Sequence, residues 1–336
     1  MITLGTDWRA LIVASLVVAA MRLPPGNQDE RYGERQVLDP ETGEWVDEAR
    51  PPEAAAADAL DEARRYLAQD KPGKARKILK RWLKESRDDE RYYEGVFLLG
   101  ETHFESGDFW QALKQYDKVA DNAAGELFRE SNRRSVDAAR AFLSGKKRIV
   151  WKILRLPAYD EGIEILDRVW ERMPGTRLGE LALKLKADFY FNQGDVDLAQ
   201  DEYANLVEQY QSGRYVQLAM LRTAEAAEAA FPGIRFDDLP LIEAEERYRQ
   251  VEAAFPGYAV RQRVRERLEG IRQTRAEKDL DIAQWYERTG QAGAARFYYE
   301  TILQSWPETL ASAEARMRLR AMGVETEETE GEESLP

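Results

Sequence analysis

The sequence predicts an all-α protein, built as an α-solenoid of about six consecutive helix pairs with a capping helix at its C-terminal end. Two observations predict this fold. Helical patterning runs from residue 54 to residue 322, and three stretches within it repeat one template of residue types at fixed offsets. Hydrophobic residues make up 43% of the chain and charged residues 33%, which is typical of a helical protein in water.

The repeated template consists of a small residue, an aromatic residue, a Gly-centred turn, an alanine and a second aromatic residue. In the three stretches its members are Gly100, Gly107, Asp108, Ala112 and Tyr116; Ala187, Tyr190, Gly194, Asp195, Ala199 and Tyr203; and Ala283, Tyr286, Gly290, Ala295, Tyr299 and Pro307. This is the tetratricopeptide pattern. One such repeat cannot bury its apolar face alone, so stacked repeats form a continuous scaffold.

The other pairs follow the template less closely. The first has its turn at residues 71–73, and its template residues are Ala63, Tyr66, Ala75, Leu79 and Trp82. The third is split by an insertion at residues 146–155, and the fifth by one at residues 231–240. A long helix over residues 260–288 begins the sixth pair. A last helix over residues 311–322 covers the exposed end of the array, as terminal repeats require.

Packing explains the residue types of the template. Small residues such as Gly100 and Ala187 let two helices approach closely, and Tyr116, Tyr203 and Tyr299 fill the space between consecutive pairs. Burying each aromatic ring contributes on the order of 2 kcal/mol. We therefore interpret these aromatics, and the single histidine His103 at a template position, as core residues.

The insertion at residues 146–155 combines basic and apolar residues. Two interpretations remain open. The insertion covers one edge of a groove, or it contacts anionic lipid or an acidic partner.

The composition of the two ends predicts three segments outside the array. Residues 1–21 contain a short apolar run with the length of a signal-peptide core; the alternatives are an uncleaved anchor and a helix packed on the solenoid. Residues 22–53 are a linker rich in proline and charge, in which Trp45 either docks on the first repeat or belongs to a flexible segment. Residues 323–336 are predicted to be an acidic disordered tail.

Several classes of function are excluded or disfavoured. The chain has no cysteine, so disulfides and thiolate chemistry are absent, and its net charge of -13 disfavours a nucleic-acid partner. It contains no glycine-rich phosphate loop, zinc-protease motif or EF-hand loop. We predict a protein that is not an enzyme and that holds no cofactor or metal.

The template places a group of side chains on the concave face of two first helices, where an extended peptide would bind. Exposed phenylalanines beside polar groups suit such a peptide, whose side chains need apolar pockets and whose backbone needs hydrogen bonds. The alternative is that these phenylalanines pack against the next repeat. The predicted groove residues are Phe97, Glu101, Phe104, Glu105, Lys184, Asp188, Phe191 and Asn192.

An arginine-rich stretch lies on the long helix of the sixth pair, in an otherwise acidic protein. Arginine forms forked hydrogen bonds to carboxylates, so the stretch is a candidate surface for a protein partner. The other interpretation is a solvated helix face with local glutamate partners. The predicted partner-binding residues are Arg267, Arg272, Arg275 and Glu277.

A run of residues near the C-terminal end is more specific than the repeat template alone. It consists of residues 245–256 (EERYRQVEAAFP), Arg267 and Leu268, residues 277–286 (EKDLDIAQWY), Gly290, Ala294, Ala295 and Tyr299, and the closing residues 306–309 (WPET). On these residues, the region from residue 234 to residue 322 resembles the C-terminal half of the BamD (ComL) family, periplasmic tetratricopeptide lipoproteins of the outer-membrane β-barrel assembly machinery. The lipid-modified cysteine of that family has no counterpart here, and the family typically has five helix pairs.

The resemblance implies a scaffold for outer-membrane protein assembly, located in the periplasm and associated with the outer membrane through partners or the N-terminal segment. It implies an N-terminal groove for segments of unfolded outer-membrane proteins, and C-terminal repeats that bind the barrel-forming subunit. The alternative function is a general periplasmic or cell-envelope tetratricopeptide adaptor, for example in envelope or polysaccharide export.

Overall fold

The structure, a computed structural model, describes residues 36–38, 45–47, 52–150 and 154–324. The chain divides into two compact units, residues 1–58 and 59–336, and the division falls inside helix α2 (Pro52–Ala68). The predicted export segment and residues 325–336 of the predicted tail lie outside the described residues. Across the described ranges, no helix combines the length and the apolar character needed to cross a membrane.

The described strands of the first unit form a small antiparallel hairpin within the predicted linker. Strand β1 (Gln36–Leu38) pairs with strand β2 (Trp45–Asp47), with Val37 opposite Val46. Trp45 is therefore the first residue of β2.

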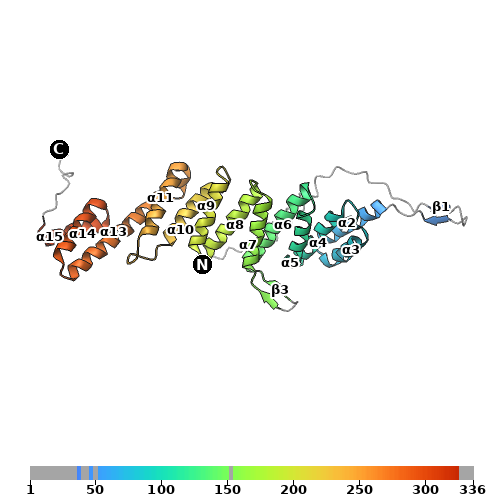
Figure 1. The fold of residues 1–336 in the computed structure, drawn as a ribbon, viewed down its shortest axis with the longest axis horizontal. Coiled ribbons are helices and arrows are strands. Elements are labelled where there is room, and N and C mark those ends of the chain that lie inside the picture. Colours follow the sequence, from blue (N-terminus) through green and yellow to red (C-terminus); the bar gives the residue numbers. More distant parts are fainter. Residues whose placement is uncertain (1–35, 39–44, 48–51, 151–153, 325–336) are drawn as a thin grey trace. The chain divides into compact units, whose positions relative to one another are not determined.

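The second unit confirms the predicted α-solenoid of helix pairs. Each helix from α3 to α11 packs against the next one in the chain, so neighbours in sequence are neighbours in space (Figure 1). The six pairs are α2 with α3 (Pro72–Glu85), α4 (Tyr92–Glu105) with α5 (Phe109–Ala120), α6 (Gly125–Leu143) with α7 (Tyr159–Arg172), α8 (Arg177–Gln193) with α9 (Val196–Gln209), α10 (Val216–Ala229) with α11 (Leu239–Ala254), and α13 (Val264–Arg288) with α14 (Ala292–Ser305).

The turn glycines of the template end the first helix of each clear pair. Gly107, Gly194 and Gly290 have φ angles of 73°, 84° and 75°, the left-handed conformation that a glycine adopts without a Cβ clash. After the first of these turns, Asp108 accepts a hydrogen bond from the backbone N–H of Gln111 and so caps α5. In the first pair Asp70 takes the left-handed conformation instead, and α3 begins at Pro72.

The small and aromatic template residues form the core, as predicted. Ala112, Ala199 and Ala295 are fully buried, as are Tyr116 and Tyr299. A Cβ added to Gly100 would lie 2.6 Å from the Tyr116 ring, so only glycine lets α4 approach α5 this closely.

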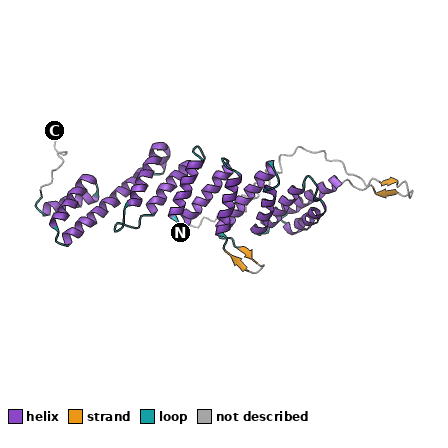
Figure 2. Cartoon of the chain, viewed as in Figure 1, coloured by secondary structure: helices purple, strands orange, loops and turns teal. Residues whose placement is uncertain are grey.

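Both predicted insertions are present, and they differ in structure. The first contains an antiparallel hairpin between α6 and α7, formed by β3 (Arg148–Val150) and β4 (Leu154–Leu156), which Figure 2 shows as the strands beside the helical array. The second is a loop before α11, fixed to α13 by ion pairs from Asp238 to Arg275 and Lys278.

The predicted long helix over residues 260–288 is interrupted near its start. A short helix, α12 (Pro256–Arg261), precedes α13, and Arg263 between them has a φ of 56°. A residue in the left-handed conformation cannot continue an α-helix. The break lets Ala259 and Val264 enter the same apolar cluster as Tyr248.

The C-terminal capping helix is confirmed as α15 (Leu310–Ala321). It packs against both α13 and α14 and buries Ala315 and Leu319 against Tyr299 of the last pair. A terminal helix that covers this apolar face keeps the end of the array soluble.

The core packing predicts that a large residue at a template alanine loosens the array locally. Ala199→Trp should lower the free energy of unfolding by about 1–3 kcal/mol or more, because α8 and α9 leave no room for an indole. Hydrogen exchange should accelerate first in α8, α9 and their neighbours. Leu198→Trp is the matched control, since Leu198 is 48% exposed on the same helix. Uniform exchange across all pairs in the Ala199→Trp chain would contradict this account.

Candidate functional site

In four helix pairs the template tyrosine donates its hydroxyl proton to a carboxylate on the first helix of the same pair. The ring must be buried for the helices to pack, and its hydroxyl then needs an acceptor. The four bonds are Tyr116 to Glu101 at 2.5 Å, Tyr203 to Asp188 at 2.6 Å, Tyr248 to Glu228 at 2.6 Å and Tyr299 to Glu287 at 2.6 Å. We call these the tyrosine–carboxylate bonds.

The environment of these tyrosines keeps them protonated. Burial, followed by the neighbouring carboxylate and the hydrogen bond to it, raises the pKa of Tyr116 well above its ordinary value. Burial and the hydrogen bond to Asp188 likewise raise the pKa of Tyr203, and Tyr248 and Tyr299 follow the same pattern with their own carboxylates. The phenol is therefore the stable form across the neutral range.

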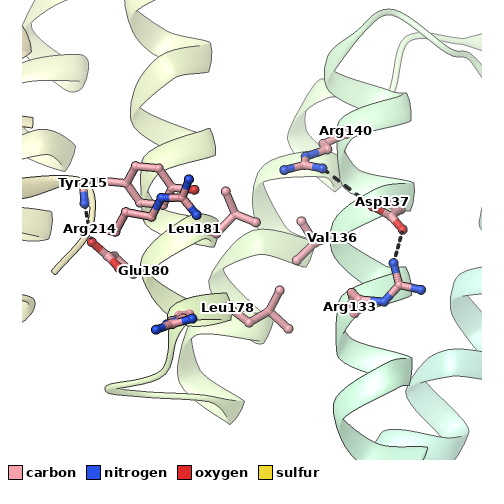
Figure 3. Close-up of a pocket in the computed structure, with 10 residues that line it drawn as sticks. Arg133, Val136, Asp137, Arg140, Leu178, Glu180, Leu181, Arg214 and Tyr215 are labelled. Carbon is pink, nitrogen blue, oxygen red and sulfur yellow. Dashed lines mark hydrogen bonds and ion pairs between the residues drawn. The ribbon is translucent and has the colours of Figure 1, made fainter. Parts of the chain in front are cut away.

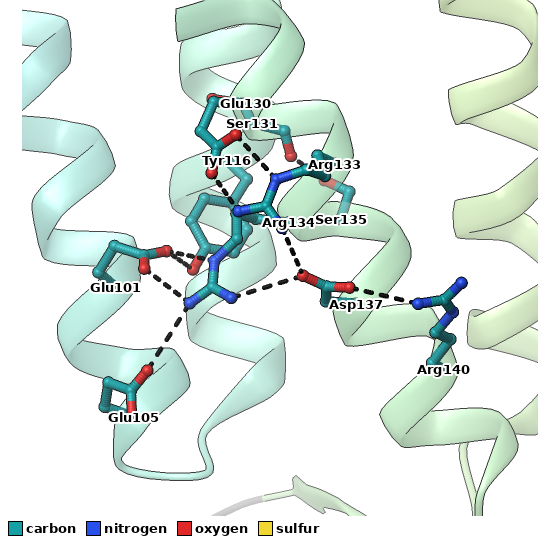
Figure 4. Close-up of polar contacts among 10 residues, drawn as sticks. All are labelled: Glu101, Glu105, Tyr116, Glu130, Ser131, Arg133, Arg134, Ser135, Asp137 and Arg140. Atoms are coloured by element: carbon teal, nitrogen blue, oxygen red, sulfur yellow. Dashed lines mark hydrogen bonds and ion pairs between the residues drawn. The ribbon is translucent and has the colours of Figure 1, made fainter. Parts of the chain in front are cut away.

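Arg134 links the second pair to the third through one of these carboxylates (Figure 4). Its Nε and Nη2 donate to the two oxygens of Glu101 at 2.8 and 2.6 Å, a forked geometry that fixes the orientation of both side chains. The Arg134 side chain is only 8% exposed, and its guanidinium lies 4.1 Å from the centre of the Phe104 ring. Burial alone would lower the pKa of Arg134, but Glu101 outweighs it and raises the pKa above its ordinary value.

Arginines farther along the chain approach the carboxylates in the same way. Arg267 donates to Glu228 at 3.1 Å, and Arg318 lies 3.7 Å from Glu287. Three of the four tyrosine–carboxylate bonds are thus tied to an arginine of a later helix, whereas Asp188 pairs with Lys184 of its own helix. These contacts hold consecutive elements together.

The predicted groove residues of the second pair lie at this contact between repeats. Glu101 is bonded to Tyr116 and Arg134, Phe104 is 8% exposed between Arg134 and Phe109, and Glu105 lies 3.7 Å from Arg134. Burial raises the pKa of Glu105. The Phe97 ring is half-buried, 5.6 Å from the Tyr116 ring. Most of this set therefore takes part in contacts within the array.

The groove residues of the fourth pair lie on α8 in a comparable arrangement. Lys184 forms an ion pair with Asp188, which also accepts from Tyr203. Phe191 is half-buried beneath the Arg222 guanidinium, 4.8 Å from the ring centre, and Asn192 is exposed near the turn. A peptide groove over these residues stays a prediction.

Three of the predicted partner-binding residues are engaged inside the second unit. Arg267, half exposed, faces Glu225 and Glu228 of α10; Arg272 bonds the carbonyl of Pro307. Arg275 pairs with Asp238 and Glu245 and is 19% exposed. Glu277 is exposed and makes no ion pair with a described residue. Their role toward a partner also stays a prediction.

Among the described residues, two pairs lack a tyrosine–carboxylate bond, the first, where Leu79 stands in place of the tyrosine, and the third. Leu166, which is 1% exposed, occupies the template position of the tyrosine and offers no hydroxyl. Arg177 and Arg214, which follow this pair in the sequence, therefore have no tyrosine-bound carboxylate of the third pair to contact. Both line a cleft instead.

This arginine cleft lies between α6, α8 and the start of α10, with a volume of about 380 Å³ (Figure 3). Four arginines and two carboxylates stand around apolar side chains. Its lining residues are Arg133, Val136, Asp137, Arg140, Arg177, Leu178, Glu180, Leu181, Arg214 and Tyr215.

The arginines of the cleft differ in how far they are neutralised. Arg133 forms a forked pair with Glu130, and Arg140 reaches Asp137 only at 3.8 Å. Arg177 and Arg214 are exposed and form no ion pair with any residue that the structure describes. The cleft consequently holds cationic groups that are available to an anionic ligand.

Glu180 has a structural role at the base of the cleft. Its side chain is almost fully buried and accepts a hydrogen bond from the backbone N–H of Tyr215 at 2.6 Å. A Cβ at Gly213 would overlap Glu180 Oε1, so glycine is required where this loop passes the carboxylate. Glu180 thereby fixes the loop that carries Arg214.

The single histidine and the acidic side chains are the other groups whose chemistry bears on function. His103 is mostly buried, with Nδ1 3.7 Å from Asp108, and burial followed by the nearby Arg76 lowers the pKa of its imidazole. Within the same described ranges, no group of three or more histidine, aspartate or glutamate side chains is placed to hold a metal ion.

Sequence reasoning did not find the arginine cleft. Its residues come from α6, the start of α8 and the loop before α10, and no local motif marks them. The available signal was the leucine at position 166, where the three clear repeats have tyrosine.

Comparison with known proteins finds similar solved structures, among them several tetratricopeptide proteins. No protein-family description matches the sequence, and no curated protein is detectably similar to it. The C-terminal part of a repeat protein from Cytophaga hutchinsonii is 14% identical, with 77% of this chain and 87% of that one covered and a TM-score of 0.39. A tetratricopeptide protein from Parabacteroides merdae is 9% identical, with 80% and 99% covered and a TM-score of 0.37.

A thermophilic tetratricopeptide protein from Thermus thermophilus is 15% identical, with 64% of this chain and 98% of that one covered and a TM-score of 0.29. Because these TM-scores are low, the assignment of the fold rests on the structure of this protein and not on the similar structures. Its paired helices, left-handed glycine turns and buried template residues make it a tetratricopeptide-type scaffold. None of these three similar structures is described as a member of the BamD family.

The contact between the second and third pairs predicts unequal effects for two adjacent arginines. Arg134→Ala leaves Glu101 partly buried without its cation, and should lower the free energy of unfolding by about 3–5 kcal/mol. Arg133→Ala, one residue earlier and 45% exposed, should cost less than about 1 kcal/mol. Chemical denaturation of both variants measures the difference, and equal losses would show that burial of Arg134 is not what makes the contact strong.

The raised tyrosine pKa values predict a loss of stability in alkali. An unfolded tyrosine releases its proton near pH 10, whereas the buried tyrosines hold theirs to higher pH, so the unfolded state binds fewer protons there. Stability is therefore full below about pH 10 and falls as the pH rises above it.

Tyr203→Phe should reduce the steepness of this fall, although it also removes one hydrogen bond worth about 1 kcal/mol at neutral pH. Tyr159→Phe, at a side chain that is 38% exposed, serves as the control. The measurement is the unfolding free energy from pH 8 to pH 11. A Tyr203→Phe chain with the same alkaline slope as the parent protein would contradict the assignment.

Proposed function

We propose that this protein is a non-enzymatic adaptor that holds other proteins against its helix array, and that it acts in the cell envelope as a BamD-like component of outer-membrane protein assembly. The observation that carries the adaptor role is a scaffold of paired helices with an arginine cleft, in which Arg177 and Arg214 form no ion pair with a described residue. Charged side chains without an ion-pair partner, held on a rigid scaffold, are typical of binding sites for another molecule.

A second surface on the last pair supports a protein partner. Trp285 and Phe297 are 50% and 63% exposed. Their rings continue through Tyr286 and Tyr298, with neighbouring ring centres 4.9, 5.3 and 5.7 Å apart. We call these four residues the aromatic row. Exposed tryptophan and aromatic side chains are enriched at protein interfaces and often carry much of the binding energy.

The BamD-like role rests on the sequence resemblance of residues 234–322, which include the aromatic row. In the proposed arrangement, the C-terminal repeats bind the barrel-forming subunit, and Arg267 and Glu277 on α13 contribute to the same interface. The N-terminal half receives segments of unfolded outer-membrane proteins. Export through residues 1–21 and a periplasmic location belong to the same proposal.

Co-purification tests the proposed role. The full-length chain, expressed with an affinity tag in its native host, should capture a β-barrel protein with repeated periplasmic domains. Capture of envelope-export components without any β-barrel protein would favour the general envelope adaptor. Sequencing the N-terminus of the purified protein tests export, since a mature chain that begins near residue 21 requires cleavage of the apolar segment.

The aromatic row gives a specific prediction for this capture. The double variant Trp285→Ala with Phe297→Ala should retain less than about a tenth of the captured partner, because truncation of an aromatic hot spot costs about 2 kcal/mol or more. Stability should change little, since both rings are at least half exposed. Met317→Ala removes an exposed apolar side chain from α15 outside the row and should capture normally. Full capture by the double variant would remove the row from the interface.

A further inference from the structure

We infer that the arginine cleft binds an extended segment of a partner protein that carries carboxylate side chains beside an apolar side chain. Arg177 and Arg214 bind the carboxylates, and Leu178 and Leu181 receive the apolar group. This inference rests on the proposed adaptor function and assigns the chemistry of one of its binding surfaces.

The missing tyrosine–carboxylate bond explains why the cations are available here. At Glu101 and Glu228 the carboxylate of that bond also receives an arginine from a later helix. Leu166 replaces the tyrosine in the third pair, and the arginines of the following element have no such acceptor. Arg177 stands at the first position of α8 and Arg214 just before α10, on either side of Glu180 in the sequence.

The charges that face the cleft leave an excess of cations. Glu130 is taken by Arg133, and Glu180 accepts the backbone N–H of Tyr215. Asp137 is shared among three arginines, at 3.5 Å from Arg133, 3.5 Å from Arg134 and 3.8 Å from Arg140. In a protein of net charge -13, this local excess attracts an anionic group.

The apolar part of the cleft indicates that the anion belongs to a peptide. Val136 is 1% exposed, and the half-buried Leu178 and Leu181 stand beside it, so an inorganic anion would leave these apolar groups unused. A volume of about 380 Å³ accommodates a few side chains and excludes a folded domain. In an extended chain, alternate side chains point to the same side about 7 Å apart, so acidic and apolar residues at every second position face one wall together.

A direct binding measurement tests the inference. The probe is a fluorescein-labelled synthetic peptide with the pattern Glu-Ser-Leu-Ser-Glu between Gly-Ser flanks, amidated at its C-terminus, and the readout is fluorescence anisotropy with the full-length chain. Arg177→Ala and Arg214→Ala should each weaken binding about tenfold, as expected for loss of a charge-assisted hydrogen bond. Leu181→Ser should weaken it as well, and added salt should weaken it further.

Two controls separate the cleft from general electrostatics. Arg129→Ala lies on α6 outside the cleft, is 63% exposed, and should bind the probe as the parent chain does. A probe with Gln in place of Glu should lose at least tenfold in affinity. Equal binding of the Gln probe, or an equal loss in Arg129→Ala and Arg177→Ala, overturns the inference.

Two further experiments distinguish an internal segment of a partner protein from other occupants of the cleft. Binding that requires a free C-terminal carboxylate on the probe would assign the cleft to chain ends and overturn an internal segment. A full-length chain with Gln at Glu325, Glu327, Glu328, Glu330, Glu332 and Glu333 tests the protein's own acidic C-terminal residues as the occupant. A tenfold gain in probe affinity in that variant would replace the partner with this segment.

The outcome is independent of the test of the proposed function. If Arg177→Ala and Arg214→Ala bind the probe normally while the parent chain still captures its envelope partner, the cleft assignment falls and the adaptor role stands. If the probe binds in the cleft as expected but no envelope partner is captured, the cleft assignment stands without the proposed cellular role.

Discussion

The hydrogen bond between a buried tyrosine and a carboxylate of the paired helix is the contact on which the rest of the array depends. The ring is buried because the helices need it to fill the space between pairs, and its hydroxyl is carried inside with it. An acceptor must follow, and in four pairs this is a carboxylate, which then requires a cation. Arg134 meets that requirement from the next pair. Packing within one repeat thereby determines the polar contact to its neighbour.

The sequence was sufficient for the architecture because the template is governed by short-range packing. Gly100, Ala112 and Tyr116 must have their sizes if two helices are to touch, so their spacing alone indicates the pair. The break at Arg263 was missed because arginine carries no helix-breaking signal, and only the burial of Ala259 and Val264 in one cluster explains it. The hairpin in residues 146–155 was likewise indicated only as an insertion.

The candidate site was harder to predict from the sequence than the fold. Whether a side chain is exposed depends on which residues of the next repeat pack against it. Phe104 and Glu101 have the spacing of groove residues, yet Arg134, 30 residues or more away, covers one and neutralises the other. Arg275 stands in a basic stretch but is paired with Asp238 from a loop that no local pattern brings near it. Arg177 and Arg214 of the cleft form no ion pair with a described residue, and they follow the third pair, in which Leu166 stands in place of the template tyrosine.

The net charge of the whole protein restricts which acidic partners bind in such a cleft. A net charge of -13 repels a strongly acidic partner at long range, while the cleft attracts carboxylates only within a Debye length, roughly 8–10 Å in physiological salt. A partner that is acidic throughout therefore experiences the repulsion over its full surface and gains the attraction at one point. A segment with a few carboxylates in an otherwise neutral or basic chain gains nearly all of the attraction. Together with the apolar floor at Val136, this favours partners whose acidic residues are few, local and flanked by apolar side chains.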